Sequence, residues 1–340
     1  MDDKKIPYII AEIGLNHNGK FSIAKESIIK AAKCGVDAVK FQNFITEDFI
    51  KNKNLTHTYY VGKKKITKSL YEICKKSEYK NEWTKKLINL CKKKNIDFLS
   101  TPTSKKGVDH LKKNNLKVIK NGSDYLVHLE LIEYMAKKNF QIILSTGMAD
   151  KRDIDEALKV IKKNSTIKPI LLHCVSQYPT ENKYLNLGRI KSLKKKYKLK
   201  IGFSDHSIGP QAACQAVALG AVVFEKHFTV DKNLNGPDHS FSCNPKEMKI
   251  YVDSIKESMV RMGSDEIKPS KIEKEFKDEV RLGCVLNISV KKNEKLKKEY
   301  VIYQKNSKGM LPVDIKKYLN KKLRFNLNKG SVLKKNYFKI

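Results

Sequence analysis

Two short segments of this chain decide its architecture: Gly202–His206, which reads GFSDH, and Phe224–Phe228, which reads FEKHF. Each lies at the end of a run of β-branched and aromatic residues, and a helical stretch separates the two. Consecutive parallel strands end at the same rim of a sheet, so this spacing brings His206 and His227 together. Two neutral imidazoles with open positions beside them are typical of a divalent-metal site. The two segments therefore predict a parallel α/β fold with a metal site at its rim.

Six further apolar runs precede these two, and segments with helical apolar spacing lie between them. The eight predicted strands are Tyr8–Gly14, Ala38–Gln42, Phe98–Pro102, Val118–Lys120, Ile142–Gly147, Pro169–Val175, Ile201–Ser207 and Val222–Phe228. Eight strands that alternate with helices indicate an α/β protein built as a (β/α)8 TIM barrel, which we expect over residues 1–263. The long segment Ile45–Lys80 interrupts this rhythm, and we expect it to form a lid or rim loop.

The pattern changes after Gly263. Residues 264–280 are charged and helical or linker-like, and residues 281–340 contain short strands and turns. The predicted strands of this part are Cys284–Val290, Tyr300–Tyr303 and Leu323–Leu327. We therefore expect a linker over 264–280 and a second, small module over 281–340.

The chain is strongly basic, with 70 Lys and Arg against 36 Asp and Glu and a net charge of +34. Such a charge is compatible with a nucleic-acid-binding protein on a barrel scaffold, which is the alternative from another class. The excess is nearly all Lys, spread over expected helix faces and loops such as Lys92–Lys94 and Lys194–Lys196. Arg, which reads base edges with two hydrogen bonds, is scarce. We therefore expect no nucleic-acid partner.

The sequence predicts neither a membrane span nor an N-terminal signal peptide. No apolar run approaches the ~18 residues of a membrane span, and residues 1–5 lack the apolar centre of a signal peptide. The seven cysteines form no CxxC pair. Reduced thiols of this kind favour a cytoplasmic protein without a membrane partner.

Polar side chains recur at the predicted ends of the strands, where a barrel places its active site. They are Glu12, Lys40, Gln42, Thr101, Lys120, Ser123, Ser145, Tyr178, Ser204, His206 and His227. Lysines and hydroxyls together suit a phosphate and a carboxylate, and Glu12 is placed for acid–base work. His173 lies in an apolar run, where a core histidine and a functional one are equally expected. His17, between two Asn, is compatible with turn chemistry alone.

The motifs as a set resemble the sialic acid synthase family, which includes N-acetylneuraminate, legionaminate and pseudaminate synthases. They follow the family order and are AEIGLNHNG from Ala11, VKFQ from Val39, LSTP from Leu99, LSTGM from Leu144, YPT from Tyr178, SDH from Ser204, EKHFT from Glu225 and GPD from Gly236. The resemblance covers essentially the whole chain. It implies that residues 281–340 form the family's antifreeze-like (SAF, β-clip) domain.

The resemblance implies that phosphoenolpyruvate condenses with an open-chain acetamido sugar, with Mn²⁺ or Mg²⁺ as cofactor. In this reading His206 and His227 hold the metal and Glu12 serves as acid or base. The expected phosphate and carboxylate ligands are Lys40, Thr101, Lys120, Ser123, Ser145 and Ser204, and the expected sugar contacts are Gln42, Tyr178 and Asp238. The family's small domain caps the barrel of a partner in a domain-swapped homodimer, and Lys305 takes the place of its usual Arg.

Several positions depart from the family pattern, among them Phe41, Lys298 and Asn320, and three more bear on the sugar. Tyr125 stands where an acidic residue is common, Ser176 where N-acetylneuraminate synthases often have Asn, and Lys305 replaces Arg. N-acetylneuraminate synthase is our first expectation, with a legionaminate or pseudaminate synthase as the alternative. An aldolase that forms a Schiff base at Lys120 is a further alternative.

Overall fold

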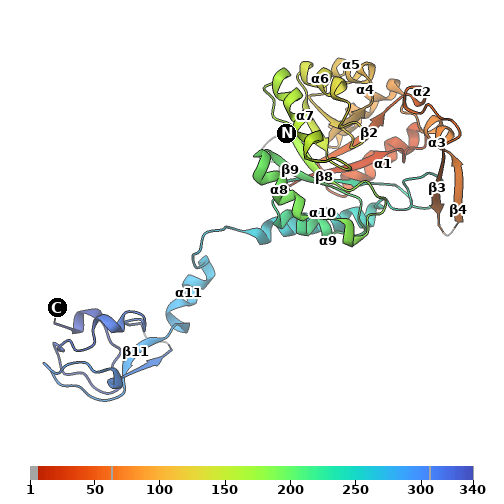
Figure 1. The fold of residues 1–340 in the computed structure, drawn as a ribbon. Helices are drawn as coiled ribbons and strands as arrows, with labels where there is room; N and C mark the ends of the chain where they lie inside the picture. The colour runs from red at the N-terminus through yellow and green to blue at the C-terminus, as the bar shows by residue number, and fades with distance from the viewer. Residues whose placement is uncertain (1–6, 63, 306–307, 340) are drawn as a thin grey trace. The chain divides into compact units, whose positions relative to one another are not determined.

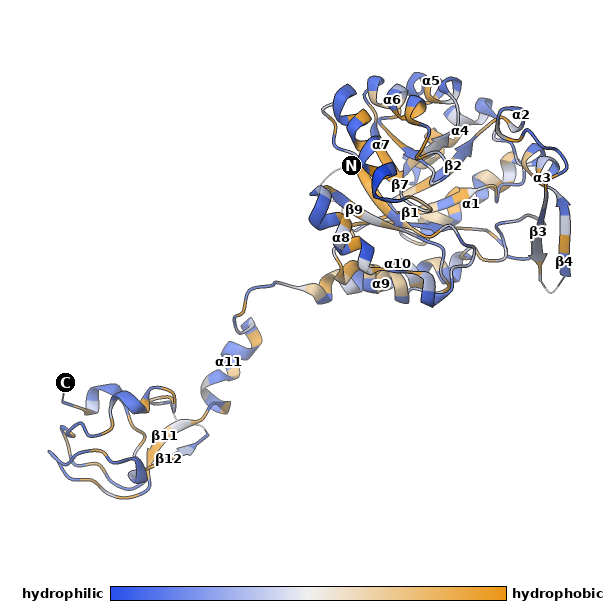
Figure 2. Ribbon diagram, viewed as in Figure 1, coloured by the Kyte–Doolittle hydropathy of each residue, from blue (hydrophilic) through white to orange (hydrophobic). Residues whose placement is uncertain are grey.

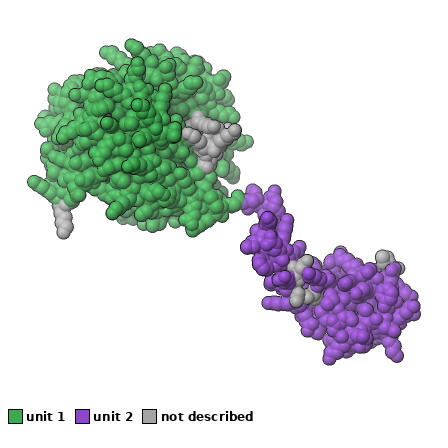
Figure 3. Space-filling view, turned by 180° about the vertical axis from the view of Figure 1, so that it is seen from behind, with its two compact units in different colours: residues 1–263 green, residues 264–340 purple. Residues whose placement is uncertain are grey.

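The computed structural model describes residues 7–62, 64–305 and 308–339. The chain divides into two compact units, one up to Gly263 and one from Ser264 onward, which Figure 3 colours separately. Each unit is described by itself below.

Eight parallel strands form the centre of the first unit. They are β1 (Tyr8–Gly14), β2 (Ala38–Asn43), β5 (Asp97–Pro102), β6 (Val118–Asn121), β7 (Gln141–Ser145), β8 (Ile170–Cys174), β9 (Lys200–Asp205) and β10 (Val223–His227). Their order in the sheet is β5-β2-β1-β10-β9-β8-β7-β6, and the two end strands β5 and β6 lie in contact. The sheet is thus a TIM-like near-barrel, which confirms the predicted α/β class and all eight strands.

Helices surround this barrel (Figure 1). They are α1 (Phe21–Lys33), α4 (Thr84–Lys93), α5 (Lys105–Lys113), α6 (Leu129–Lys137), α7 (Lys151–Asn164), α8 (Gly188–Tyr197), α9 (Gln211–Ala218) and α10 (Pro245–Met262), with a short 3-10 turn η2 (Asn182–Tyr184) before α8. The start of α10 follows from its sequence, because Asn244 and Glu247 cap the first turn reciprocally and Pro245 occupies the first position. No helix among the described residues is both long and apolar enough to span a bilayer.

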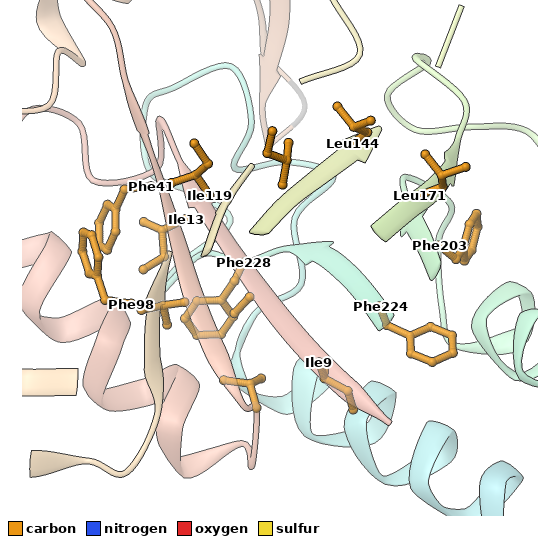
Figure 4. Packing of buried hydrophobic residues seen from close by; sticks show 14 of the residues in the cluster. Ile9, Ile13, Phe41, Phe98, Ile119, Leu144, Leu171, Phe203, Phe224 and Phe228 are labelled. Atoms are coloured by element: carbon orange, nitrogen blue, oxygen red, sulfur yellow. The ribbon is translucent and has the colours of Figure 1, made fainter. Parts of the chain in front are cut away.

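The main core lies between the strands and the helices. The strand residues that face outward, among them Ile9, Phe41, Phe98 and Phe224, pack in one buried cluster (Figure 4). Phe41 and Phe98 stack with ring centroids 5.4 Å apart. In Figure 2 the apolar colour follows the strands and the inner sides of the helices. This two-sided burial is why the strands read as nearly continuous apolar runs in the sequence.

The segment that we expected to be a lid or rim loop has secondary structure of its own. It contains α2 (Thr46–Phe49), the antiparallel hairpin β3 (Thr56–Val61) and β4 (Lys64–Ser69), and α3 (Leu70–Lys76), and the 3-10 turn η1 (Asn81–Trp83) follows it. The Tyr59 hydroxyl donates to Asn235 Oδ1 at 2.7 Å, which ties the hairpin to the loop after β10. The sequence analysis did not predict this hairpin, because the alternating pattern of a short exposed hairpin is weak in the sequence. A role of the segment as a lid stays a prediction.

The second unit begins with α11 (Lys271–Val280) and continues with the antiparallel pair β11 (Gly283–Leu286) and β12 (Val301–Gln304). Single bridges and the 3-10 turns η3 (Lys298–Tyr300), η4 (Ile315–Lys317) and η5 (Lys335–Tyr337) make up much of the rest. Its own small core consists of Cys284, Leu286, Val290, Leu296, Met310, Ile315, Leu323, Leu333 and Phe338. Asn320 adopts the left-handed conformation, with φ 63°, that its side chain tolerates.

Candidate active site

Alternation along the strands places the predicted polar residues inside the barrel. Side chains two residues apart share one face of a strand. Ile10 faces the barrel interior, so Glu12 faces it as well, one step closer to the carboxyl end. The same step leads from Val223 to Glu225 and His227. The interior is thus apolar at one end and polar at the other.

A cavity of about 310 Å³ opens at the polar end. Eleven of the residues predicted from the sequence line it: Glu12, Lys40, Gln42, Thr101, Lys120, Ser123, Ser145, Tyr178, Ser204, His206 and His227. Asp238 approaches from the loop after β10, with its Oδ2 3.7 Å from His227 Nδ1. Lys305 is exposed and belongs to the second unit. None of the described residues 45–80 lines the cavity.

Two buried lysines form the floor of this cavity. Lys40 Nζ donates to Thr101 Oγ1 at 3.0 Å, and Lys120 Nζ donates to Ser145 Oγ at 2.6 Å. Their side chains are only 4% and 3% exposed. Burial lowers the pKa of Lys120, whereas the nearby Glu12 and Glu225 outweigh burial and raise that of Lys40.

Glu12 and Glu225 supply the counter-charge. Glu12 Oε2 lies 2.7 Å from Lys40 Nζ, and Gln42 Nε2 donates to Glu12 Oε1 at 3.0 Å. The two oxygens of Glu225 lie 3.8 Å from the two lysine nitrogens, one to each. Burial raises the pKa of Glu12, with the charge of Glu225 adding to the effect. For Glu225, the two lysines overcome burial and lower the pKa.

Glu225 was missing from the predicted site residues, although it precedes His227 by two positions. Its place between the lysines depends on the pairing of β9, β10 and β1, which positions Ser204 Oγ to donate to it at 3.0 Å. One signal in the sequence could have identified Glu225. It is a charged residue inside a buried strand, and it lies on the same face of that strand as His227. Other lining residues outside the predicted site are Phe44, Thr103, Met148 and Cys174, and Asp124 and Tyr125 lie beside them.

The two histidines face each other across one side of the cavity. The His206 and His227 rings lie 5.5 Å apart between centroids. His206 Nδ1 lies 2.7 Å from the carbonyl oxygen of Val175, an arrangement that leaves its Nε2 toward the cavity as the acceptor atom. Burial and the charge of His206 hold the pKa of His227 well below its usual range, so its ring is neutral. Burial opposes protonation of His206 too, but its contact with Cys174 outweighs this and raises the pKa.

These residues fit a divalent cation that is held by two imidazoles. His227 Nδ1 is buried and has no hydrogen-bond partner in the described part of the chain. The described residues contain no group of three or more His, Cys, Asp and Glu arranged around one point. A metal here would therefore have two protein nitrogens as its core ligands and positions left for substrate or water.

Tyr178 forms the wall above the imidazoles. Its ring lies 4.1 Å from that of His206 and 5.6 Å from that of His227 between centroids. Burial raises the pKa of the Asp238 carboxyl to about 7, with the charge of Glu12 adding to the effect. Tyr178 and Asp238 therefore both lie beside the imidazole pair.

Two histidines from the sequence motifs lie outside this site. His173 faces away from the cavity, stacks on Phe203 and places Nε2 2.7 Å from the carbonyl oxygen of Leu185. His17 is fully buried against Phe41 and Trp83, and its Nδ1 accepts from the backbone of Gly19. Both side chains are part of the packing.

The fold and the site define a barrel protein with two buried lysines and an imidazole pair at the carboxyl ends of its strands. The model of the NeuB family matches residues 27–267, and the chain belongs to this family.

Known relatives span nearly the full chain. N,N'-diacetyllegionaminic acid synthase of Campylobacter jejuni is 39% identical over 92% of this chain and 94% of its own. Pseudaminic acid synthase of C. jejuni is 31% identical over 99% of this chain and 98% of its own length. The crystal structure of N-acetylneuraminic acid synthetase from Leptospira borgpetersenii, in complex with citrate, has a TM-score of 0.72 and 34% identity and covers 80% of this chain and 90% of its own. The family therefore includes synthases of several sialic-acid-like sugars.

Proposed function

We propose that this protein is a nonulosonic acid synthase, which condenses phosphoenolpyruvate with an acetamido sugar and water and releases phosphate. The observation that carries the proposal is the pair of buried lysines, 4% and 3% exposed, on the hydroxyl-lined floor of the cavity. Each lysine nitrogen has two close partners, Thr101 and Glu12 for Lys40 and Ser145 and the Asn121 carbonyl for Lys120. Glu225 lies 3.8 Å from each nitrogen, so the third N–H of each ammonium is available to an anionic ligand. Phosphoenolpyruvate offers both a phosphate and a carboxylate for this floor.

Phosphoenolpyruvate would lie over Lys40 and Lys120. Ser145 and Thr101, which already accept from these lysines, extend the same polar surface. The anion would take over part of the charge compensation that Glu225 now provides at 3.8 Å from each nitrogen. The charge of Glu225 acts to raise the pKa of both lysines and so favours their charged forms before the substrate binds.

The sugar would lie between this floor and the imidazole pair, beside Tyr178 and Asp238. The methylene carbon (C3) of phosphoenolpyruvate forms a bond to the aldehyde carbon, and the aldehyde oxygen gains a proton. Positive charge is left on C2, the carbon that carries the phosphate oxygen. Glu12 is placed to deliver that proton from Oε1 or Oε2, since burial raises its pKa. Water then adds to C2 and returns a proton to Glu12. The bond from C2 to the phosphate oxygen breaks, the second proton of the water leaves with phosphate, and C2 becomes the keto carbon of the product.

A divalent cation, Mn²⁺ or Mg²⁺, belongs to this proposal, with His206 and His227 as its ligands. When bound, it would act as a Lewis acid on the aldehyde oxygen. The contact of His206 with the Val175 carbonyl fixes the ring orientation for such a role.

The second unit has a proposed role as well. We assign it the place of the family's antifreeze-like domain, which would cap the barrel of a second copy in a homodimer. Lys305 of that domain would reach the sugar with a single ammonium group. The contact would be looser than one from Arg, because Lys lacks the planar fork.

The test is phosphate release from phosphoenolpyruvate across a panel of acetamido sugars, with mass spectrometry of the products. The proposal predicts a product that equals the sum of both substrates and water minus phosphoric acid. Absence of phosphate release with every sugar, with and without Mn²⁺, would contradict it.

One observation supports a second candidate. The lowered pKa of Lys120 favours a neutral amine, as a Schiff-base aldolase requires. Lys120 is, however, engaged with Ser145 and the carbonyl oxygen of Asn121. Borohydride reduction in the presence of pyruvate distinguishes the two, because only the aldolase acquires a covalent adduct on Lys120.

A further inference from the structure

A buried ion pair lies on the outer face of the two strands that end in the imidazoles. Asp205 and Lys226 are neighbours in the register of β9 and β10, and Lys226 Nζ lies 3.2 Å from Asp205 Oδ2. Their side chains are 0% and 3% exposed. Two residues earlier on the same outer face, Phe203 and Phe224 are apolar and belong to the main core (Figure 4). The proposed site uses neither Asp205 nor Lys226.

Stability alone does not explain two charges in this apolar layer. The removal of an ammonium and a carboxylate from water is costly, and their attraction offsets the cost only where the geometry is good. Apolar side chains of similar volume are often as stable, or more stable, in such a place. The ion pair is better explained by a second role, which is to hold one conformation of the chain beside it.

Both charged groups hold the residue that follows His206. Asp205 Oδ1 accepts from the backbone N–H of Ser207 at 2.8 Å and from its hydroxyl at 2.6 Å. Lys226 Nζ donates to the carbonyl oxygen of Ser207. The backbone N–H of Thr180, in the loop after β8, donates to the carbonyl oxygen of His206 at 2.9 Å. The main chain of His206 and Ser207 is thus hydrogen-bonded from outside the active-site cavity.

Apolar packing contributes little to the position of this turn. A second cavity of about 200 Å³ is lined by residues 207–210 and by Ile250 and Tyr251 of α10. Within the turn, Ile208 is 62% exposed. Lys226 lines the same cavity, with Nζ 5.3 Å from the centroid of the Tyr251 ring. The turn is therefore held mainly by its polar contacts to the ion pair.

We propose that Asp205 and Lys226 are positioning residues, which act through Ser207 to fix the imidazole of His206 as a metal ligand. This inference rests on the proposed function, because it assigns what orients one of the two proposed ligands. The contact of His206 Nδ1 with the Val175 carbonyl sets the rotation of the ring, and the ion pair sets the main chain that carries the ring. Groups that orient a metal ligand typically change metal affinity or activity by about 10- to 100-fold.

The experiment measures Mn²⁺ affinity by electron paramagnetic resonance, together with kcat and the KM for phosphoenolpyruvate. A single replacement would leave one buried charge unpaired, so both residues are changed at once. In Asp205→Leu/Lys226→Met, Mn²⁺ affinity and kcat should both fall about 10- to 100-fold. The KM for phosphoenolpyruvate should change by no more than about twofold, because Lys40 and Lys120 are unaltered. The midpoint of denaturant unfolding should stay the same or rise.

A second double variant, Asp205→Asn/Lys226→Met, tests the route through Ser207. The amide oxygen still accepts hydrogen bonds from Ser207, whereas leucine accepts none. This variant should therefore lose less Mn²⁺ affinity than the leucine variant. Tyr8→Phe is the matched control, because it removes a hydrogen bond of 2.6 Å to Asp97 at the amino end of the strands. It should leave Mn²⁺ affinity unchanged.

Each contrary outcome has a definite meaning. Wild-type Mn²⁺ affinity in the folded leucine variant overturns the inference and leaves the proposed synthase intact. An equal loss of affinity in the two double variants, or the same loss in Tyr8→Phe, overturns the route through Ser207. Failure of both double variants to fold overturns it too, because the pair would then be required for stability. Absence of Mn²⁺ binding to the wild-type protein overturns the metal site and the inference together, whereas phosphate release tests the synthase separately.

Discussion

The two ends of the barrel interior are built on the same strands with opposite chemistry. The inner cluster at the amino end is apolar and consists of Tyr8, Ile10, Ala38, Leu99, Ile143, Ile170, Leu172 and Val223. Two residues further along the strands, Ile10 is succeeded by Glu12 and Val223 by Glu225. A barrel thus separates stability from function within single strands. Substitutions at the two ends should separate these properties as well.

The largest effect on activity is expected at the imidazole pair. His227→Ala should abolish turnover and weaken Mn²⁺ binding, because one of two protein ligands is lost. Electron paramagnetic resonance of Mn²⁺ measures binding independently of turnover. His57→Ala, on the exposed hairpin, is the control. Unchanged Mn²⁺ affinity in folded His227→Ala, or full turnover in excess chelator, would exclude the proposed metal site.

Loss of a floor lysine should have the next largest effect. Lys120→Met keeps much of the aliphatic chain and removes the charge, so kcat/KM should fall about 10²- to 10³-fold, as for other fixed electrostatic contacts. Lys117→Met, at the exposed side of the same barrel segment, should have no effect on the rate. Steady-state kinetics on both variants measure the difference, and similar rates for the two would show that the floor does not bind the anion.

Glu12→Gln should lower kcat by about 100-fold, in the range of a positioned acid or base. Phosphoenolpyruvate affinity, measured by titration calorimetry, should change much less than kcat, because Lys40 and Lys120 remain. A near wild-type kcat would mean that Glu12 only balances the charge of Lys40, 2.7 Å away.

The smallest effect on activity is expected at the apolar end. Leu172 is fully buried, and its Cδ2 fills the space beside Gly202 where a side chain would otherwise lie. Leu172→Ala should reduce the free energy of unfolding by about 2–5 kcal/mol. Denaturant unfolding measures this loss, and kcat should stay within about twofold because no contact to the polar end changes. A large fall in kcat would show that the two ends are coupled.

Much of this arrangement could be predicted from the sequence, because parallel strands buried on both faces give short apolar runs and end in polar residues. Lys40, Lys120 and the imidazoles followed from their positions at strand ends. Whether a strand residue points into the barrel or toward the helices changes from one residue to the next. His173 faces outward and Cys174 inward for this reason, and the sequence left the role of His173 open.

The carboxylates that balance the buried lysines could not be predicted from the sequence. Glu225 balances Lys40 and Lys120 only because β1, β2, β6 and β10 come together around one cavity. The hairpin β3–β4 was missed because its strands are short and mostly exposed.

The most direct test of the central claim follows the oxygen that bridges carbon and phosphorus in phosphoenolpyruvate. With that position labelled with ¹⁸O, and with the preferred acetamido sugar and Mn²⁺ present, the account predicts that all label leaves in inorganic phosphate. The new oxygen on C2, the carbon that carried the phosphate, would then come from water. Label retained in the sugar product would show that the phosphorus–oxygen bond breaks instead, and it would contradict the proposed synthase.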